Sequence, residues 1–164
     1  MNLSEDELIA LGIKYRGTII DECAALEKWI ESYIAMYFTW NGERAFEMLE
    51  LVLDRLTFDS KIGVFEAMLK KKHKDQFKKL YDKLMSELRI IKDERNKFAH
   101  YNQHLENSEQ IVILSSYRNS HTLHKYTNDD FVRLINRIER CGLIIKELSD
   151  DMWDLDESGS PYKP

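Results

Sequence analysis

Glycine and proline are scarce in this sequence, with six Gly and two Pro among 164 residues. Such a composition is unsuited to an all-β fold built on many tight turns, and it favours long helices. The length is typical of a single domain that buries a sizeable core. We therefore expect one all-α domain over residues 1–151, followed by a flexible acidic tail over residues 152–164.

Cysteine is rare as well, and long apolar runs are absent. Cys23 and Cys141 both lie in apolar helical patterns, and two such residues make no disulfide framework. We expect buried free thiols in a reducing cytoplasm. No window approaches 18 uncharged apolar residues, which predicts no membrane span. The N-terminal segment MNLSEDELIA has neither the basic start nor the apolar run of a signal peptide. These absences favour a cytoplasmic location.

The chain also lacks net positive charge, since its formal net charge is −5. A general nucleic-acid binder is therefore not expected, and contacts to phosphate would have to come from a local basic patch. The strongest patch is KKKHKDQFKK, residues 70–79, where the candidate phosphate contacts are Lys70, Lys71, Lys72 and Lys74. The alternative is a solvated junction between two helices.

Apolar residues recur at helical spacing in most of the chain. Helices are expected over residues 4–41, about 42–57, about 60–69, about 74–102, and from a cap at Thr127 or Asn128 onward. Ser4 and Glu7 form an S-x-x-E capping box at the start of the first helix, and Ser60 is the expected N-cap of the third.

The periodicity changes after residue 103. The segment QIVILSSYRNSHTLHKYT contains a β-branched run, a turn candidate at RNS and a second extended stretch. This pattern predicts a β-hairpin with strands at about residues 110–117 and 121–126. The expected fold class is an all-α helical bundle of about five helices with a small β-hairpin before the last helix.

On a helical wheel at about 100° per residue, the fourth helix carries an apolar stripe with one interruption. The stripe consists of Phe77, Leu80, Leu84, Leu88, Ile91 and Phe98. Arg95 fills the gap between Ile91 and Phe98. A guanidinium cannot lose its charge, so on an apolar face it needs an anion, a water-filled cleft or a partner chain. The alternatives are that Arg95 snorkels past Phe98 or pairs with a carboxylate of another helix.

Two further polar residues follow Arg95. Asn96 and His100 are four residues apart and share a face of the helix. His100 lies about 140° around the helix from Arg95, so the two do not share a face in a straight helix. Long side chains, a tightened helix end or a second copy across a dimer would bring them together. His100 near a helix C-terminus is also a favourable partner of the helix dipole.

The segment RNKFAH, residues 95–100, has the form R-x4-H with a polar residue after the Arg. It stands late in a long helix, before a hairpin and one more helix. This arrangement resembles the HEPN superfamily (higher eukaryotes and prokaryotes nucleotide-binding domains), whose hallmark is an Arg followed by a polar residue and, after a short spacing, a His. Arg95, Asn96 and His100 match these positions. The architecture extends the resemblance over about residues 4–150, but only the motif matches residue by residue.

One departure concerns the tyrosine of a HEPN toxin subgroup. Toxins paired with nucleotidyltransferase antitoxins carry H-x-Y, which would place a Tyr at position 102, where this chain has Asn102. Tyr101 is at best a displaced equivalent. Modification of a motif tyrosine by such a partner is therefore in doubt for this chain.

The resemblance implies a metal-independent endoribonuclease without a cofactor, in a toxin or phage-defence role. Arg95 would stabilise charge on the phosphate, His100 would act as general acid or base, and Asn96 would hydrogen-bond the phosphate or orient His100. The 2′-OH of RNA would be the nucleophile, leaving 2′,3′-cyclic phosphate and 5′-OH ends. HEPN domains commonly pair, so a homodimer is expected, and an antitoxin protein is a further possible partner. Tyr101 and Arg118 are additional candidate contacts to RNA. The alternative is a HEPN-like module that binds or assembles without catalysis.

Histidine spacing also suggests a metal site. His100, His104, His121 and His124 are spaced like metal ligands, but no Cys is nearby and carboxylate partners are unplaced. On a strand, His121 and His124 would face opposite sides. We expect no metal.

Overall fold

The computed structural model describes residues 4–39, 41–104, 112–116 and 122–157. Within these residues it contains five α-helices, two short 3-10 helices and three strands. In chain order they are α1 (Glu5–Thr39), α2 (Gly42–Leu51), η1 (Leu53–Arg55), α3 (Phe58–His73), η2 (Lys74–Gln76), α4 (Phe77–His100), β1 (Asn102–His104), β2 (Val112–Ser116), β3 (Thr122–Tyr126) and α5 (Asn128–Glu157). The predicted fold class, a helical bundle with a small β element before the last helix, is confirmed.

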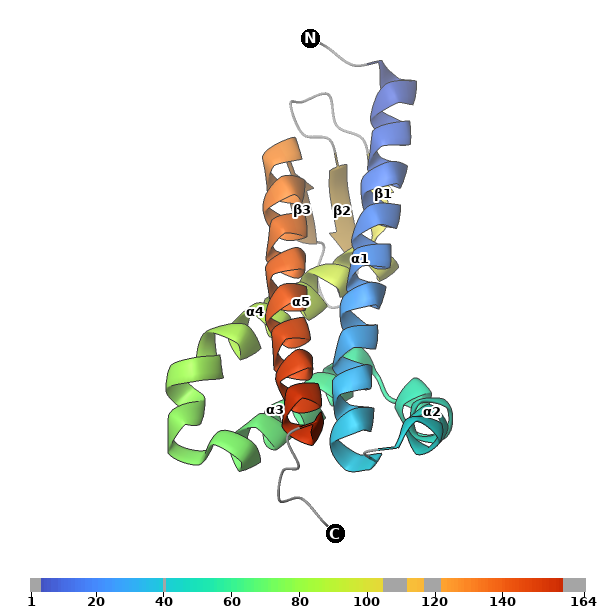
Figure 1. The fold of residues 1–164 in the computed structure, drawn as a ribbon. Helices are drawn as coiled ribbons and strands as arrows, with labels where there is room; N and C mark the ends of the chain where they lie inside the picture. Colours follow the sequence, from blue (N-terminus) through green and yellow to red (C-terminus); the bar gives the residue numbers. More distant parts are fainter. Residues whose placement is uncertain (1–3, 40, 105–111, 117–121, 158–164) are drawn as a thin grey trace.

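Two pairs of helices form the bundle. The long helices α1 and α5 lie side by side and run in the same direction (Figure 1). Near their starts, Tyr15 stacks on Phe131 with ring centroids 4.0 Å apart. Helices α3 and α4 run antiparallel, and ion pairs join Glu66 to Arg89 at 2.5 Å and Asp59 to Lys92 at 3.1 Å. Helix α4 ends near the sheet, so the motif lies at the sheet end of the molecule (Figure 1).

The helix boundaries follow local capping chemistry. The predicted capping box is confirmed, because the Ser4 amide donates to Glu7 Oε2 at 2.8 Å and the Glu7 amide donates to Ser4 Oγ at 3.3 Å. The predicted N-cap of the third helix is wrong. The N-cap of α3 is Thr57, whose Oγ1 accepts from the Ser60 amide at 3.2 Å. An N-cap side chain satisfies an amide three residues later, so Ser60 is the residue that is capped rather than the cap.

Three predicted helix ends also shift. Helix α2 stops at Leu51 rather than near residue 57. The 3-10 helix η1, Leu53–Arg55, follows it. Helix α3 runs on to His73, so its last turn carries Lys70 to His73, where cations interact favourably with the helix dipole. Helix α4 begins at Phe77 and ends at His100 rather than at residue 102.

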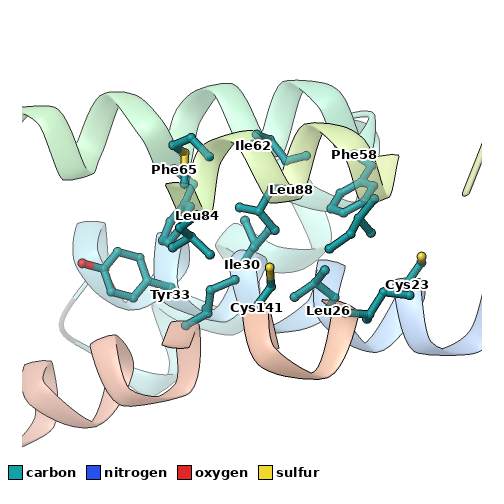
Figure 2. Close-up of a cluster of buried hydrophobic side chains, with 14 of the residues drawn as sticks. Cys23, Leu26, Ile30, Tyr33, Phe58, Ile62, Phe65, Leu84, Leu88 and Cys141 are labelled. Carbon is teal, nitrogen blue, oxygen red and sulfur yellow. The ribbon is translucent and has the colours of Figure 1, made fainter. Parts of the chain in front are cut away.

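Side chains from α1, α3, α4 and α5 interlock in one core, part of which is drawn in Figure 2. The contribution of α4 is a seam whose members are spaced alternately by four and three: Phe77, Tyr81, Leu84, Leu88, Ile91, Arg95 and Phe98. All but Arg95 are buried. The predicted stripe was wrong at Leu80, which is 50% exposed, because the seam passes through Tyr81 instead. Cys23 and Cys141 are buried free thiols of the same core, as predicted.

The sheet has the order β1-β2-β3, with both pairs antiparallel. The described parts of the predicted hairpin correspond to β2 and β3, whereas β1 was not predicted. The turn candidate at residues 118–120 lies outside the described residues. The alternating burial of β3 places His124 and Tyr126 on its inner face and leaves Leu123 and Lys125 exposed.

The junction between β3 and α5 is capped at Thr127. The Asp130 amide donates to Thr127 Oγ1 at 3.3 Å, and the Thr127 amide donates to Asp130 Oδ2 at 2.8 Å. Helix α5 continues to Glu157, so residues 152–157 are helical, and residues 158–164 lie outside the described part of the chain. None of the helices described is long and apolar enough to cross a membrane.

Candidate functional site

Arg95 is a half-buried cation in the seam of α4. Across from it, Cys23 of α1 is buried. Burial raises the pKa of the Cys23 thiol to about 12, and the positive charge of Arg95 opposes that rise. Because Arg95 is only partly exposed, its guanidinium lies at the edge of the core rather than free in solvent. Such a position costs solvation free energy that an anion would return.

Among the described residues, Arg95 forms no ion pair with a carboxylate. Its hydrogen bond goes to Asn96, where Arg95 Nη1 donates to the Asn96 amide oxygen at 3.3 Å. The guanidinium therefore reaches toward the face of α4 that Asn96 shares with His100. No hydrogen bond joins Arg95 to His100 in the described structure. Within the described side chains, the alternative in which Arg95 pairs with a carboxylate of another helix is not seen.

His100 is exposed and is the last residue of α4. The helix ends there because Tyr101 turns to an extended conformation, with φ −88° and ψ 148°. The Tyr101 amide still donates to the carbonyl oxygen of Lys97 at 3.0 Å. The imidazole of His100 is therefore presented at the point where the chain leaves the helix.

Arg16 of α1 holds this helix end in place. Its Nη2 donates to the main-chain oxygens of Ala99 at 3.2 Å and Tyr101 at 3.1 Å, on either side of His100. Helix-terminal carbonyls lack partners within the helix, and a basic side chain can satisfy them. Sequence reasoning missed Arg16, because nothing local marks a residue that acts on a turn so distant in the chain.

Tyr101 and the inner face of β3 form a second group beside the motif. The Tyr101 ring is half-buried and lies against His124, with centroids 5.7 Å apart. Burial and, secondarily, the charge of Lys97 lower the pKa of His124. Glu94 accepts from Tyr126 Oη at 2.6 Å and pairs with Lys97 at 2.6 Å. Burial, followed by the hydrogen bond to Glu94, raises the pKa of Tyr126.

The candidate phosphate-binding lysines lie at the other end of α4. The 24 residues of this helix span about 36 Å. Lys71, Lys72 and Lys74 are exposed, whereas Lys70 pairs with Glu66 at 2.9 Å and lies over the Phe77 ring. The structure therefore does not bring these lysines together with the motif in one protomer.

Lys74 ends α3 with a φ of 42°, a left-handed conformation. This backbone conformation redirects the chain from α3 into η2 and α4. Arg118, the remaining candidate RNA contact, lies outside the described residues.

Two hollows of about 320 Å³ and 410 Å³ run along α5, and neither is lined by a motif residue. Among the described side chains, no three His, Cys, Asp or Glu groups lie together as a metal site requires.

No family model matches the sequence, and searches of curated proteins and of solved structures found no significant match. The resemblance to the HEPN superfamily therefore rests on the motif and its helical setting.

Proposed function

We propose that this protein is a metal-independent endoribonuclease of the HEPN type. The observation that carries the proposal is Arg95, a half-buried cation in a core seam without a carboxylate partner among the described residues. A protein optimised only for stability would place an apolar residue there, as at the other six seam positions. An arginine kept without a counter-ion is suited to an anionic ligand, and a phosphate fits its planar array of donors.

The neighbouring groups suit cleavage of RNA at a phosphodiester. Asn96 accepts from Arg95 and orients it, and His100 is exposed at the end of the helix. The 2′-OH attacks the adjacent phosphorus, and the bond to the 5′-oxygen breaks. Arg95 stabilises the growing negative charge on the phosphate oxygens. His100 transfers a proton, a role suited to imidazole because its ordinary pKa of about 6.5 lies near neutral pH. The products carry 2′,3′-cyclic phosphate and 5′-OH ends.

The resemblance to HEPN domains also supports proposals for the oligomeric state, the location and the biological role. A homodimer in which two copies enclose the RNA fits the exposed His100 at the end of α4, and HEPN domains commonly pair in this way. A cytoplasmic toxin or phage-defence enzyme, restrained by an antitoxin protein, is the biological role that the resemblance implies. Neither a metal nor another cofactor enters the chemistry.

A second candidate function is a HEPN-like module that binds or assembles without catalysis. It is favoured by the missing hydrogen bond between Arg95 and His100, since a catalytic pair commonly converges on one reacting group. Long side chains that close only around a bound phosphate would account for the same observation. The two candidates differ in whether RNA is cut.

The test is incubation of purified protein with RNA in excess EDTA. Wild type is expected to cut, leaving 2′,3′-cyclic phosphate ends. His100→Ala is expected to lose about 10²–10⁴-fold in rate, the range for a proton-transfer group. Arg95→Ala is expected to lose about 10²–10³-fold, as for removal of one transition-state donor. Arg89→Ala, an exposed arginine of the same helix, serves as the control and is expected to keep full activity. Intact RNA with wild type, or equal cutting by all variants, contradicts the proposal.

A further inference from the structure

His124 lies beside the motif although it is 24 positions away in the chain. Strand β3 turns it inward together with Tyr126. Its ring contacts Tyr101, the residue that directly follows His100, with centroids 5.7 Å apart and planes at 34°. On α4, Lys97 acts on His124 through its charge and is three residues before His100, a spacing at which helix side chains are neighbours. His124 therefore lies against Tyr101, the residue that follows His100, and near Lys97, one helical turn before His100.

The proposed reaction needs two proton-transfer groups. One group takes the proton from the 2′-OH, and the other gives a proton to the departing 5′-oxygen. His100 supplies one of them. The other must come from a second copy of the motif or from another residue of the same chain.

We propose that His124 is the general base of this site and that His100 of the same protomer is the general acid. The inference rests on the proposed ribonuclease function. His124 takes the 2′-OH proton as the 2′-oxygen forms its bond to phosphorus. The bond from phosphorus to the 5′-oxygen breaks, and His100 gives that oxygen its proton. Exchange of protons with water restores both imidazoles.

The surroundings of His124 suit a base. The charged groups that face it from α4 are Lys97 and Glu94, and on β2 it pairs with the buried Leu114. Burial, reinforced by Lys97, lowers the pKa of His124, whereas Glu94 raises it less. A lowered pKa favours the neutral imidazole, which is the form that accepts a proton.

The test uses His124→Phe, which keeps a ring against Tyr101, and Leu123→Ala on the exposed face of β3 as its control. A cleavage site is first located in a mixed RNA. An oligonucleotide that carries this site at a single ribose is then the substrate. His124→Phe is expected to lose about 10²-fold or more in kcat, while its thermal unfolding and its KM stay near those of wild type. It is also expected to lose the acid limb of the pH–rate profile, because that limb reports protonation of the base. Full activity with an unchanged profile overturns the assignment.

A second substrate separates base from acid. In an oligonucleotide with sulfur in place of the bridging 5′-oxygen, the leaving thiolate needs no proton. This substrate is expected to restore cleavage by His100→Ala but not by His124→Phe. Rescue of His124→Phe instead overturns the assignment of roles.

Mixing the variants tests whether one protomer holds both groups. Protomers of His100→Ala and His124→Phe, refolded together, are expected to stay inactive, because no protomer carries both imidazoles. Recovered activity overturns the same-protomer assignment. If wild type leaves RNA intact in EDTA, both the ribonuclease function and the role of His124 fall. If wild type cuts RNA, His100→Ala does not, and His124→Phe cuts as fast as wild type, the role of His124 is wrong while the ribonuclease function stands.

Discussion

Arg16 and Tyr101 are 85 positions apart in the sequence, yet Arg16 Nη2 donates to the main-chain oxygen of Tyr101 at 3.1 Å. The same nitrogen reaches the oxygen of Ala99 at 3.2 Å. The first helix thus fixes the backbone on both sides of His100. Whatever His100 does depends on a side chain that is remote in sequence.

Replacing Arg16 is expected to weaken both stability and activity. Arg16→Leu leaves two half-buried carbonyls without their charged donor, and hydrogen bonds to charged groups contribute about 1.5–3 kcal/mol. We expect a loss of about 2 kcal/mol in the free energy of unfolding, measured by urea denaturation. RNA cleavage by the protein that remains folded is expected to fall in kcat more than in KM, because His100 loses its position.

Lys14→Leu is the matched control, since Lys14 is exposed on the same helix. It is expected to change the free energy of unfolding by no more than about 0.5 kcal/mol. Equal stability and equal kcat for the Arg16 and Lys14 variants would show that the contact to the end of α4 is dispensable.

Lys61 is a buried cation that holds α3 to α1. It is 4% exposed and contacts Glu27 at 2.5 Å and the buried Glu31. Lys61→Met would leave these carboxylates without their shared partner, and breaking a buried pair costs about 3–5 kcal/mol. We expect a loss of that size in chemical denaturation. Adding Glu31→Gln to the variant is expected to restore part of the loss, because it removes the buried charge left behind.

Lys28 is the control, because it also pairs with Glu31, at 2.7 Å, but is 64% exposed. Lys28→Met is expected to cost no more than about 1 kcal/mol, as for surface ion pairs. If it costs as much as Lys61→Met, burial is not what makes the Lys61 contacts strong.

Lys61 also predicts how the free energy of unfolding depends on alkaline pH. Burial lowers the pKa of Lys61, but its hydrogen bonds to Glu27 and Glu31 outweigh burial and raise the pKa above the ordinary 10.5. A raised pKa in the folded state contributes stability that is complete below 10.5 and is lost as pH rises through the folded value. Above pH 10.5, wild type is therefore expected to lose stability more steeply than Lys61→Met. Parallel losses would contradict the shift.

Sequence periodicity was sufficient for the fold class and most of the core but not for its exact register. Leu80 and Tyr81 are adjacent, and a spacing of three or four from Phe77 admits either one. The seam passes through Tyr81, and Leu80 is 50% exposed. The selection depends on how α3 and α4 pack, which no local pattern specifies. Arg95 was identified correctly as an interruption, because a charge among apolar positions is visible on a single helix.

The remainder of the site depends on contacts between distant elements. His124 was considered only as a metal ligand together with His121, on the basis of spacing. Its place beside Tyr101 follows from the docking of β3 against the end of α4. Arg16 carried no signal at all, since its role exists only once α1 and α4 are packed together.

The basic patch is expected to matter only for long RNA. Lys71 and Lys72 are exposed at the end of α3, just before the start of α4, and the 24 residues of α4 rise about 36 Å to His100, a length spanned by roughly ten stacked nucleotides. A variant with both replaced by Ala is expected to bind long RNA more weakly, with a salt dependence reduced by about 0.7 per lost phosphate contact. Cleavage of an oligonucleotide of two or three nucleotides is expected to stay the same.

Lys14→Ala combined with Lys146→Ala removes the same charge from α1 and α5 and serves as the control. If this variant weakens binding to long RNA as much as replacement of Lys71 and Lys72, the effect comes from net charge rather than from the patch.

Arg95 is expected to lower the free energy of unfolding while being required for RNA cleavage. Arg95→Leu would make the α4 seam apolar from Phe77 to Phe98 and remove a half-buried charge that has no carboxylate partner among the described residues. We expect the free energy of unfolding to rise by about 1 kcal/mol while RNA cleavage is lost, as when a residue is kept for activity at the expense of stability. Lys83→Leu, at an exposed position of α4 outside the seam, is expected to change stability by less than about 0.5 kcal/mol. A destabilised Arg95→Leu would show instead that the arginine is structural, and would favour the module without catalysis.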